Sequence, residues 1–345
     1  MSFAFSRMLL AAVVLSGISC KDKPSTASGT TEAGAVAVTS TGGKRLKIAV
    51  IPKGTTQEYW KSVHAGAVKA AKEADVDIVW KGPLKEDDLK SQIDTLSTFV
   101  AQGVSGIVVA PLNDAALKAP VKSAVDAKIP VIVFDSDIQG DAHTSFIATD
   151  NQAAGRLAAE GLAKALDGKG KLVLLRYQEG SASTSNREKG FLDDLKGKTG
   201  LSLVSDNQYA GATTDAALQK SENLLLAHKA DAGGVDGVFT PNESTTFGML
   251  QALKKSGLNR KVKLVGFDAS DKLVQALRDG DIEGLVVQNP FNMGYVSVKS
   301  MADQLRGKPV DKRIDTGARY VDKSNVDDPA VKEILSPDLK QWLGE

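Results

Sequence analysis

Five polar residues stand at the ends of predicted apolar strands or just after a Gly/Ser-rich loop. Aspartate offers paired acceptors, Asn and Gln offer a donor and an acceptor, and arginine offers a rigid fork of donors. A ring of neighbouring hydroxyl groups, each both donor and acceptor, can satisfy such a set completely. The pattern therefore indicates a site for a sugar or polyol, built from Asp135, Asn242, Asp268 and Gln288 at strand ends and Arg187 after the loop.

Each of these residues also has a structural explanation. An Asp that follows a strand often caps the next helix through its carboxylate, and for one residue alone this would be the simpler interpretation. Five polar groups in two parts of the chain are harder to explain as caps. We therefore favour binding for the set as a whole.

Two aromatic residues, Tyr59 and Trp60, stand at the start of the first predicted helix. Aromatic residues at such a place are more often part of the core, but an aromatic face can also stack on the C–H side of a sugar ring. The loop before them, residues 53–58, is expected to face the same crevice. Tyr59 and Trp60 therefore join the candidate site.

The elements that must position these residues alternate along the chain from residue 45. Short apolar runs rich in β-branched residues, such as 46–51, alternate with longer amphipathic ones, such as 59–75. This alternation is typical of parallel strands that helices bury on both faces. Two βα blocks of similar size predict an α/β fold with two doubly wound parallel-sheet lobes. Ligands bind such sheets beyond the carboxyl ends of the strands, where the polar residues stand.

We expect the first lobe to contain residues 45–148 and 289–315, and the second to contain residues 149–288 and 316–345. A helix over 294–306 and a strand over 317–321 come too late to belong to a single lobe, so the chain must cross again. The prediction is a three-strand hinge near residues 148–150, 288–290 and 315–317. Within the second lobe, we expect a helix over 187–195 that Arg187 opens.

Composition narrows the classes of function. Lys plus Arg number 43 and Asp plus Glu number 42 in 345 residues, a net charge of +1. Such a chain has no net basic field for a phosphate backbone, so we expect no nucleic-acid partner. One cysteine cannot form an internal disulfide or a Cys-based zinc site, and the three histidines are not at ligand spacing. We therefore expect no metal and no cofactor.

The N-terminal residues indicate export. Residues 1–19 combine Arg7, an apolar run over 8–15 and small residues, which is the pattern of a signal peptide and too short to span a bilayer. Cys20 follows them in a context similar to the lipobox of bacterial lipoproteins, which implies a lipidated Cys20. Residues 21–44 are rich in Ser, Thr, Gly and Ala and predict a flexible tether. We expect a lipid anchor to the membrane, in the periplasm or at the cell surface, with ordinary secretion or a buried structural cysteine as alternatives.

An ordered series of motifs covers nearly everything from residue 47 to about residue 321. The motifs are Ile48-Ala-Val-Ile, Tyr59-Trp-Lys-Ser-Val-His-Ala-Gly66, Ile129-Pro-Val-Ile-Val-Phe-Asp135, Ile147-Ala-Thr-Asp-Asn151, Arg187-Glu-Lys-Gly-Phe191, Val265-Gly-Phe-Asp268 and Val287-Gln288. The series resembles the periplasmic ribose-type sugar-binding proteins of ABC importers. The resemblance implies the type I periplasmic binding protein fold, whose two lobes close on a monosaccharide.

By the same resemblance, the strand-end residues match the family's ligand contacts in type. Tyr59 and Trp60 take the places of a phenylalanine pair that sandwiches the sugar. The residues carried over as contacts are Asp135, Arg187, Asn242, Asp268 and Gln288.

The chain departs from the ribose-type pattern at three places. Ser136 stands where the ribose proteins carry Arg, and Lys53 and Gln57 stand about where they use Ser and Asn. No aromatic residue is evident near Gly211 and Ala212, where one is expected. We include Lys53, Gln57 and Ser136 as further candidate contacts. The departures predict a monosaccharide or related polyol different from ribose.

The sequence thus predicts a monomeric solute-binding lipoprotein that delivers its ligand to an ABC transporter permease. A sensor that presents a sugar or autoinducer to a signalling receptor would share the fold, and sequence does not separate the two. An enzyme is disfavoured because no GxGxxG follows the first strand and no GxSxG elbow occurs with a plausible His, although Asp135 and Asp268 could act as an acid–base pair. Sugar-responsive repressors carry a helix-turn-helix where this chain has its signal peptide and tether.

Overall fold

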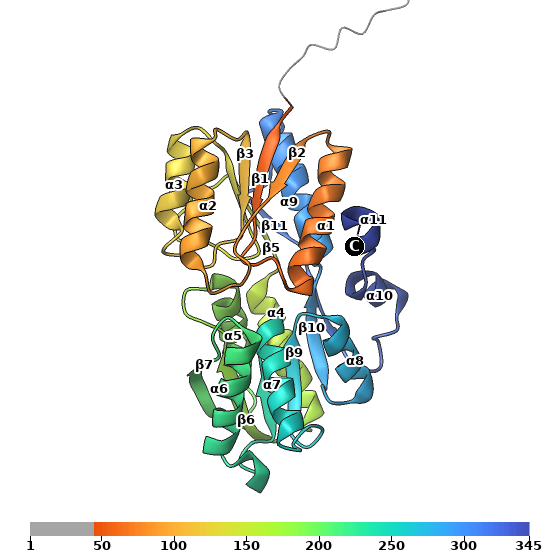
Figure 1. Cartoon of the computed structure of the whole chain (residues 1–345). Helices are drawn as coiled ribbons and strands as arrows, with labels where there is room; N and C mark the ends of the chain where they lie inside the picture. Colours follow the sequence, from red (N-terminus) through yellow and green to blue (C-terminus); the bar gives the residue numbers. More distant parts are fainter. Residues whose placement is uncertain (1–44, 345) are drawn as a thin grey trace, which may run out of the picture. The chain divides into compact units, whose positions relative to one another are not determined.

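The computed structural model describes residues 45–344. The predicted signal peptide, Cys20 and the whole of the tether lie outside the described residues. Two six-stranded sheets, each covered by helices on both faces, form two lobes (Figure 1). This confirms the predicted α/β fold with two doubly wound, mainly parallel sheets.

The first lobe has the strand order β11-β5-β4-β3-β1-β2, with every pair parallel. Alternate residues of β1 point to opposite faces: Ile48 and Val50 pack with α1 and α9, and Ala49 and Ile51 with α2 and α3. The elements are β1 (Lys47–Ile51), α1 (Glu58–Glu73), β2 (Asp77–Trp80), α2 (Leu89–Ala101), β3 (Gly106–Val109), α3 (Lys118–Asp126), β4 (Val131–Phe134), β5 (Ser145–Ala148), α9 (Pro290–Leu305) and β11 (Arg313–Asp315).

The second lobe repeats this plan with the strand order β12-β10-β9-β8-β6-β7, in which only β12 is antiparallel to its neighbour. Helices α4 and α5 cover one face, and α6, α7 and α8 the other. The elements are α4 (Asn151–Ala165), β6 (Gly170–Arg176), α5 (Ala182–Leu195), β7 (Leu201–Tyr209), α6 (Thr214–Ala227), β8 (Gly237–Phe239), α7 (Glu243–Lys255), β9 (Lys263–Phe267), α8 (Asp271–Asp279), β10 (Gly284–Gln288) and β12 (Ala318–Val321).

Both lobes contain helices in very close contact. Figure 1 shows α1 beside α9, although they are far apart in the sequence. In the second lobe, α4 and α5 approach so closely that a Cβ on Gly155 would lie 2.0 Å from the carbonyl oxygen of Arg187. Only glycine permits this approach. The backbone that carries Arg187 is therefore fixed against α4.

The chain crosses between the lobes after β5, after β10 and after β11, at the predicted hinge. The Thr149 hydroxyl of the first crossing lies 2.8 Å from Oε1 of Gln288 and 3.2 Å from the carbonyl oxygen of Gly317. The backbone N–H of Asp150 donates to Oδ1 of Asp315 at 3.0 Å. Side chains thus tie the three crossings to one another.

The structure corrects several element boundaries. Helix α5 begins at Ala182, so Arg187 lies in its second turn instead of opening it, and α9 begins at Pro290 instead of residue 294. We expected all of 316–345 in the second lobe, but the last helix packs on α1 of the first, where the Trp342 ring lies 5.9 Å from Nζ of Lys69. The elements not predicted are β11, the 3-10 helix Ala230–Ala232, α10 (Pro329–Leu335) and α11 (Leu339–Leu343).

No helix within residues 45–344 combines the length and the apolar character needed to cross a bilayer.

Candidate functional site

The carboxyl ends of the strands in both lobes surround a narrow cavity of about 20 Å³. All predicted site residues line it except Ser136 and Cys20, the latter lying outside the described residues. The lining residues predicted from sequence are Lys53, Gln57, Tyr59, Trp60, Asp135, Arg187, Asn242, Asp268 and Gln288.

Asp135 and Asp268 occupy equivalent places in the two lobes. Each has a left-handed backbone conformation, with φ of 60° and 67°, which costs a non-glycine residue about 1–3 kcal/mol. The backbone N–H of Asp135 donates to Ile147 at 3.0 Å, and that of Asp268 donates to Val286 at 2.9 Å. The neighbouring strand thus holds each strained residue in place and turns its carboxylate into the cavity.

The capping alternative holds for one strand-end residue. Asn242 is the N-cap of α7, and its Oδ1 accepts from the backbone N–H of Thr245 at 3.3 Å. Ser270, and not Asp268, precedes α8 as its N-cap. Asn242 therefore both caps a helix and lines the cavity.

Asp135 lies in a network of buried side chains from the first lobe. Nζ of Lys53 lies 2.7 Å from Oδ2 of Asp135, and the hydroxyl of Tyr59 donates to Oδ1 at 2.8 Å. Burial, followed by the charge of Asp135, raises the pKa of Tyr59 well above its usual value. Lys53 also donates to Oγ of Ser183, in the other lobe, at 3.1 Å.

Arg187 is held firmly within the second lobe. Nε donates to Oδ1 of Asn151 at 2.8 Å, and Nη1 donates to the carbonyl oxygen of Pro241 at 2.9 Å. The guanidinium also lies over the ring of Phe267, 3.9 Å from its centroid. These contacts fix the plane of the guanidinium before any ligand contact forms.

Asp268 has a longer ion pair than Asp135. Its Oδ2 lies 3.9 Å from Nη1 of Arg187 and accepts from the backbone N–H of Glu243 at 3.2 Å, and its Oδ1 accepts from Nε2 of Gln288 at 2.7 Å. Burial raises the pKa of Asp268, although Arg187 acts in the opposite direction.

Ser136 does not line the cavity but joins the lobes beside it. Its Oγ accepts from the backbone N–H of Ser183 at 3.0 Å, and its side chain is buried.

Trp60 is both a core residue and part of the cavity wall. It is 1 % exposed, and its ring contacts Tyr59 and Phe134 edge to face. The Tyr59 and Trp60 rings stand at 89° with centroids 4.9 Å apart. Two perpendicular rings in contact cannot clamp a sugar between them, so the sandwich implied by the family pattern is wrong for this conformation.

Five further residues line the cavity that sequence reasoning missed. Tyr177 directly follows β6, and Glu86 lies in the loop after β2. The sequence prediction considers only polar residues at strand ends, so it misses the aromatic Tyr177. Ser183 and Thr184 lay in the segment we expected to be a loop. The missed residues are Glu86, Tyr177, Ser183, Thr184 and Glu243.

Glu86 links both lobes through its two oxygens. Oε1 accepts from Nε1 of Trp60 at 2.6 Å, and Oε2 accepts from the hydroxyl of Tyr177. Burial raises the pKa of the Glu86 carboxyl. Burial, and then the charge of Asp268, raises the pKa of Glu243 to about 8.

The cavity therefore combines two cations with several carboxyl, amide and hydroxyl groups. Such a lining can donate to and accept from a ring of hydroxyl groups at once. Within residues 45–344, no group of three or more His, Cys, Asp or Glu could hold a metal ion.

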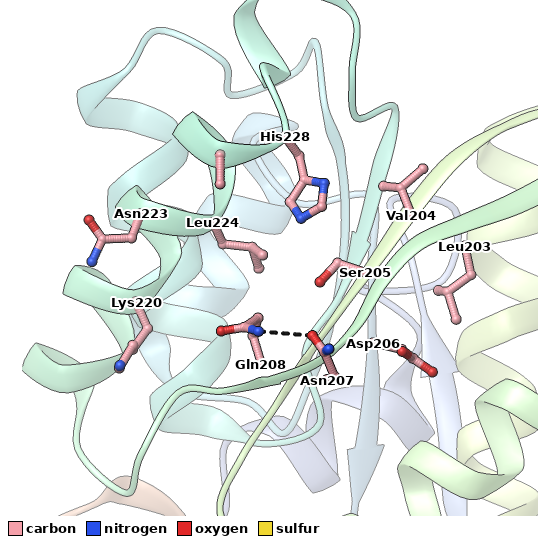
Figure 2. Close-up of a pocket in the computed structure, with 11 residues that line it drawn as sticks. Leu203, Val204, Ser205, Asp206, Asn207, Gln208, Lys220, Asn223, Leu224 and His228 are labelled. Carbon is pink, nitrogen blue, oxygen red and sulfur yellow. Dashed lines mark hydrogen bonds between the residues drawn. The ribbon is translucent and has the colours of Figure 1, made fainter.

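A wider hollow on the second lobe, between β7 and α6, has a different character (Figure 2). The side chains drawn there surround an open space, and the one hydrogen bond drawn joins Gln208 to Asn207 at 2.8 Å. Leu203 and Val204 of the edge strand are partly exposed. Among the described residues that line it, no charged side chain is buried. The cavity between the lobes is therefore the stronger candidate.

Comparison with known proteins agrees with this choice. A model of the periplasmic binding protein domain matches residues 48–309. The ribose import binding protein RbsB of Bacillus subtilis is 26% identical over 256 residues, which cover 74% of this chain and 80% of that protein.

Solved structures are more similar still. A carbohydrate transporter solute-binding protein from Agrobacterium radiobacter, in complex with D-arabinose, is 36% identical with a TM-score of 0.81, covering 85% of this chain and 99% of that one. An ABC transporter solute-binding protein from Agrobacterium vitis, with bound D-fucose, is 34% identical with a TM-score of 0.80, covering 84% of this chain and 100% of that one.

Proposed function

The chain belongs to the periplasmic binding protein domain family, and from that premise we propose that it captures one monosaccharide or related polyol between its lobes and delivers it to the permease of an ABC importer. Its relatives are sugar-binding transport proteins and not enzymes, and their family is extracytoplasmic. The observation that carries the proposal is the buried cavity whose charged and hydrogen-bonding groups come from both lobes.

Ligand contacts from both lobes are needed for closure. A ligand shifts the equilibrium between the open and closed states only as far as it binds one of them more tightly than the other. Lys53 and Asp135 belong to the first lobe, and Arg187 and Asp268 to the second. A ligand that bonds to both pairs favours the closed arrangement. The proposed contacts are Lys53, Gln57, Tyr59, Trp60, Asp135, Arg187, Asn242, Asp268 and Gln288, with Ser136 acting between the lobes.

Charge placement supports a ligand that differs from ribose. Ser136 stands where the ribose-type pattern has Arg, yet Lys53 places a cation 2.7 Å from the adjacent Asp135. The positive charge has thus moved from the residue after Asp135 to the loop after β1. Because a compact ammonium and a guanidinium fork recognise different hydroxyl arrangements, the stereochemistry accepted beside Asp135 should change.

The affinity required is within reach of this lining. A Kd near micromolar corresponds to about −8 kcal/mol. Several charge-assisted hydrogen bonds of about 1.5–3 kcal/mol each can supply it after the costs of closure and desolvation.

We also propose that the mature protein is a monomer anchored through lipid on Cys20. The apolar run before Cys20 and the small polar residues after it support this proposal. Labelling cells with a fatty-acid analogue should mark the wild-type protein, and Cys20→Ser should remove the label. A labelled Cys20→Ser variant, or an unlabelled wild type, would overturn the anchor.

Calorimetry of the soluble chain from residue 45 onward, against pentoses, hexoses, deoxyhexoses and inositols, tests the main proposal. We expect one of them to bind with 1:1 stoichiometry and to be recovered unchanged. Conversion of the bound sugar would instead favour an enzyme, and absence of binding across the panel would overturn the proposed ligand class.

A further inference from the structure

A second cavity, of about 180 Å³, adjoins the first and shares Gln57 and Glu86 with it. Its walls also come from both lobes. The first lobe contributes Gly54, Thr56, Leu84 and Lys85, and the second contributes the segment from Ala212 to Asp215. The cleft between the lobes is thus longer than the cavity that the proposed site occupies.

The first-lobe wall of the second cavity is fixed by hydrogen bonds. Thr55 donates through Oγ1 to the carbonyl oxygen of Pro83 at 3.2 Å, and Thr56 donates to that of Leu84 at 3.0 Å. These bonds tie the loop after β1 to the loop after β2. The cavity is therefore bounded by loops that hold each other in place.

The second-lobe wall explains why this space exists. The ribose-type pattern expects an aromatic residue near Gly211 and Ala212, and this chain has none there. Gly211 has a φ of 84°, which glycine adopts freely, and Ala212 offers one methyl group. A large ring is thus absent from the position where the second cavity opens.

Gln57 is the movable part of the boundary between the two cavities. Glu86 is tied to Trp60 and Tyr177. Within residues 45–344, the Gln57 side chain makes no hydrogen bond to the protein, and only its backbone carbonyl accepts, from Lys61. A rotation of this amide can connect the cavities without breaking a hydrogen bond.

We propose that the second cavity is a subsite for a second sugar unit joined to the one in the first cavity. This inference rests on the proposed function and deepens it, because it makes glycosides and disaccharides ligands of the same cleft. The lining suits such a unit: Gln57, Lys85 and Asp215 offer polar groups, and Leu84, 73 % exposed at the rim, offers an apolar surface for C–H groups. The second cavity is also larger than the first.

The test compares free sugars with their extended forms by calorimetry. The probes are D-ribose, D-arabinose, D-fucose and D-galactose, their methyl glycosides, and the disaccharides lactose, melibiose and arabinobiose. Ala212→Phe fills the second cavity from the second-lobe wall, and Thr56→Tyr fills it from the first-lobe wall. If one variant does not fold, the other still tests the subsite. Ala232→Phe, at an exposed alanine of the same lobe, is the control.

We expect at least one glycoside or disaccharide to bind the wild type within about tenfold of the best free sugar. Ala212→Phe or Thr56→Tyr should weaken that extended ligand by about tenfold or more and leave the free sugar within about twofold, whereas Ala232→Phe should change neither. The inference is overturned if only free sugars bind the wild type, or if the filled variants bind extended ligands unchanged. Failure of every sugar to bind would instead remove the proposed function itself.

Discussion

Asp135 in the first lobe and Asp268 in the second have the same backbone conformation but differ in their electrostatic surroundings. Both follow a strand with positive φ, and both donate their N–H to the next strand of the sheet. Asp135 has a lysine ammonium at 2.7 Å and a tyrosine hydroxyl at 2.8 Å. Asp268 has its guanidinium at 3.9 Å, the Gln288 amide donor at 2.7 Å and the backbone N–H of Glu243 at 3.2 Å.

The different surroundings of the two aspartates imply that the two lobes contribute differently to ligand binding. Oδ1 of Asp135 accepts a hydrogen bond from Tyr59, and Oδ2 is ion-paired with Lys53 but accepts no hydrogen bond, so the carboxylate chiefly positions Lys53 and Tyr59 for the ligand. The Asp268 carboxylate has a weaker ion pair, and its raised pKa shows that burial outweighs its partners. It therefore gains more from the hydroxyl groups of a ligand. We expect the second lobe to contribute more of the binding free energy, and each prediction below tests that ranking.

The largest effect is expected from Arg187→Ala. It removes the cation beside Asp268 and leaves the oxygens of Asn151 and Pro241 without their donor. Truncating one partner of a buried charged network costs about 2–5 kcal/mol, so the Kd of the bound sugar should rise by about 10² to 10³-fold. Calorimetry with the best sugar of the panel measures the change.

Arg187→Lys is the matched variant, because it keeps a charge but loses the planar fork and the contact over Phe267. It should bind more tightly than Arg187→Ala and more weakly than wild type. Unchanged affinity in Arg187→Ala would reverse the ranking of the lobes.

A smaller loss is expected from Lys53→Met in the first lobe. It leaves the Asp135 carboxylate buried with Tyr59 as its remaining donor. A hydrogen bond to a charged group contributes about 1.5–3 kcal/mol, which corresponds to an increase in Kd of about 10- to 100-fold.

A double-mutant cycle with Lys53→Met and Asp135→Asn separates two effects of losing Lys53: the loss of its contact with the ligand and the unpaired charge left on Asp135. Asp135→Asn removes the charge that Lys53 balances, so adding it to Lys53→Met should recover part of the thermal stability. If the effects of the two substitutions on thermal stability are additive, Lys53 does not stabilise the Asp135 carboxylate. The proposed difference between the two aspartates would then be wrong.

Both aspartates could be predicted from the sequence as site residues, but the contrast between their surroundings could not, for physical reasons. Asp135 and Asp268 stood out because each ends a run of apolar β-branched or aromatic residues, and parallel sheets bring such ends together. The partners did not stand out, because Glu86 and Tyr177 are 91 positions apart and belong to different lobes. Helix α5 was predicted to begin late because Ser and Thr favour loops and caps, whereas the carbonyl oxygen of Ser181 accepts from the N–H of Ser185 and from the Thr184 hydroxyl in a helical first turn.

The pH dependence of binding tests the second lobe's carboxyl groups. Burial raises the pKa of Glu243 to about 8, so if opening exposes this carboxyl, the closed state takes up a proton between its ordinary pKa and about 8. Affinity should therefore be highest at the acid end of this window and decrease as pH rises through it, by up to about tenfold per pH unit. The raised pKa values of Asp268 and Glu86 act in the same direction.

Glu243→Gln should flatten this profile in part, as measured by calorimetry from pH 5 to pH 8. Glu188→Gln is the control, because Glu188 is also buried with a raised pKa but bonds to Arg176 and Tyr177 of its own lobe. A profile that rises with pH, or one that Glu188→Gln flattens equally, would contradict the assignment.

The smallest effect is expected at Glu58, which joins the lobes from outside the cavity lining, through a type of contact that both lobes make. Glu58, the first residue of α1, accepts from the N–H of Asp271 at the start of α8 at 2.8 Å, while Glu243, the first residue of α7, accepts from the N–H of Tyr59 in α1 at 3.3 Å. Each glutamate thus caps a helix of the opposite lobe.

Glu58→Ala removes one of these bonds without touching the cavity lining, so it should destabilise only the closed state. A partly exposed hydrogen bond of this kind contributes about 0.5–1 kcal/mol, which predicts a two- to fivefold increase in Kd, seen mainly as faster dissociation in stopped-flow fluorescence. Glu73→Ala is the matched control, because Glu73 lies on the same helix but accepts from the Tyr295 hydroxyl within the first lobe. It should lower thermal stability slightly and leave dissociation unchanged. Equal dissociation rates in the two variants would mean that Glu58 does not stabilise the closed state. The contacts inside the cavity, including those of Asp135 and Asp268, would then account for the whole stability of the closed state.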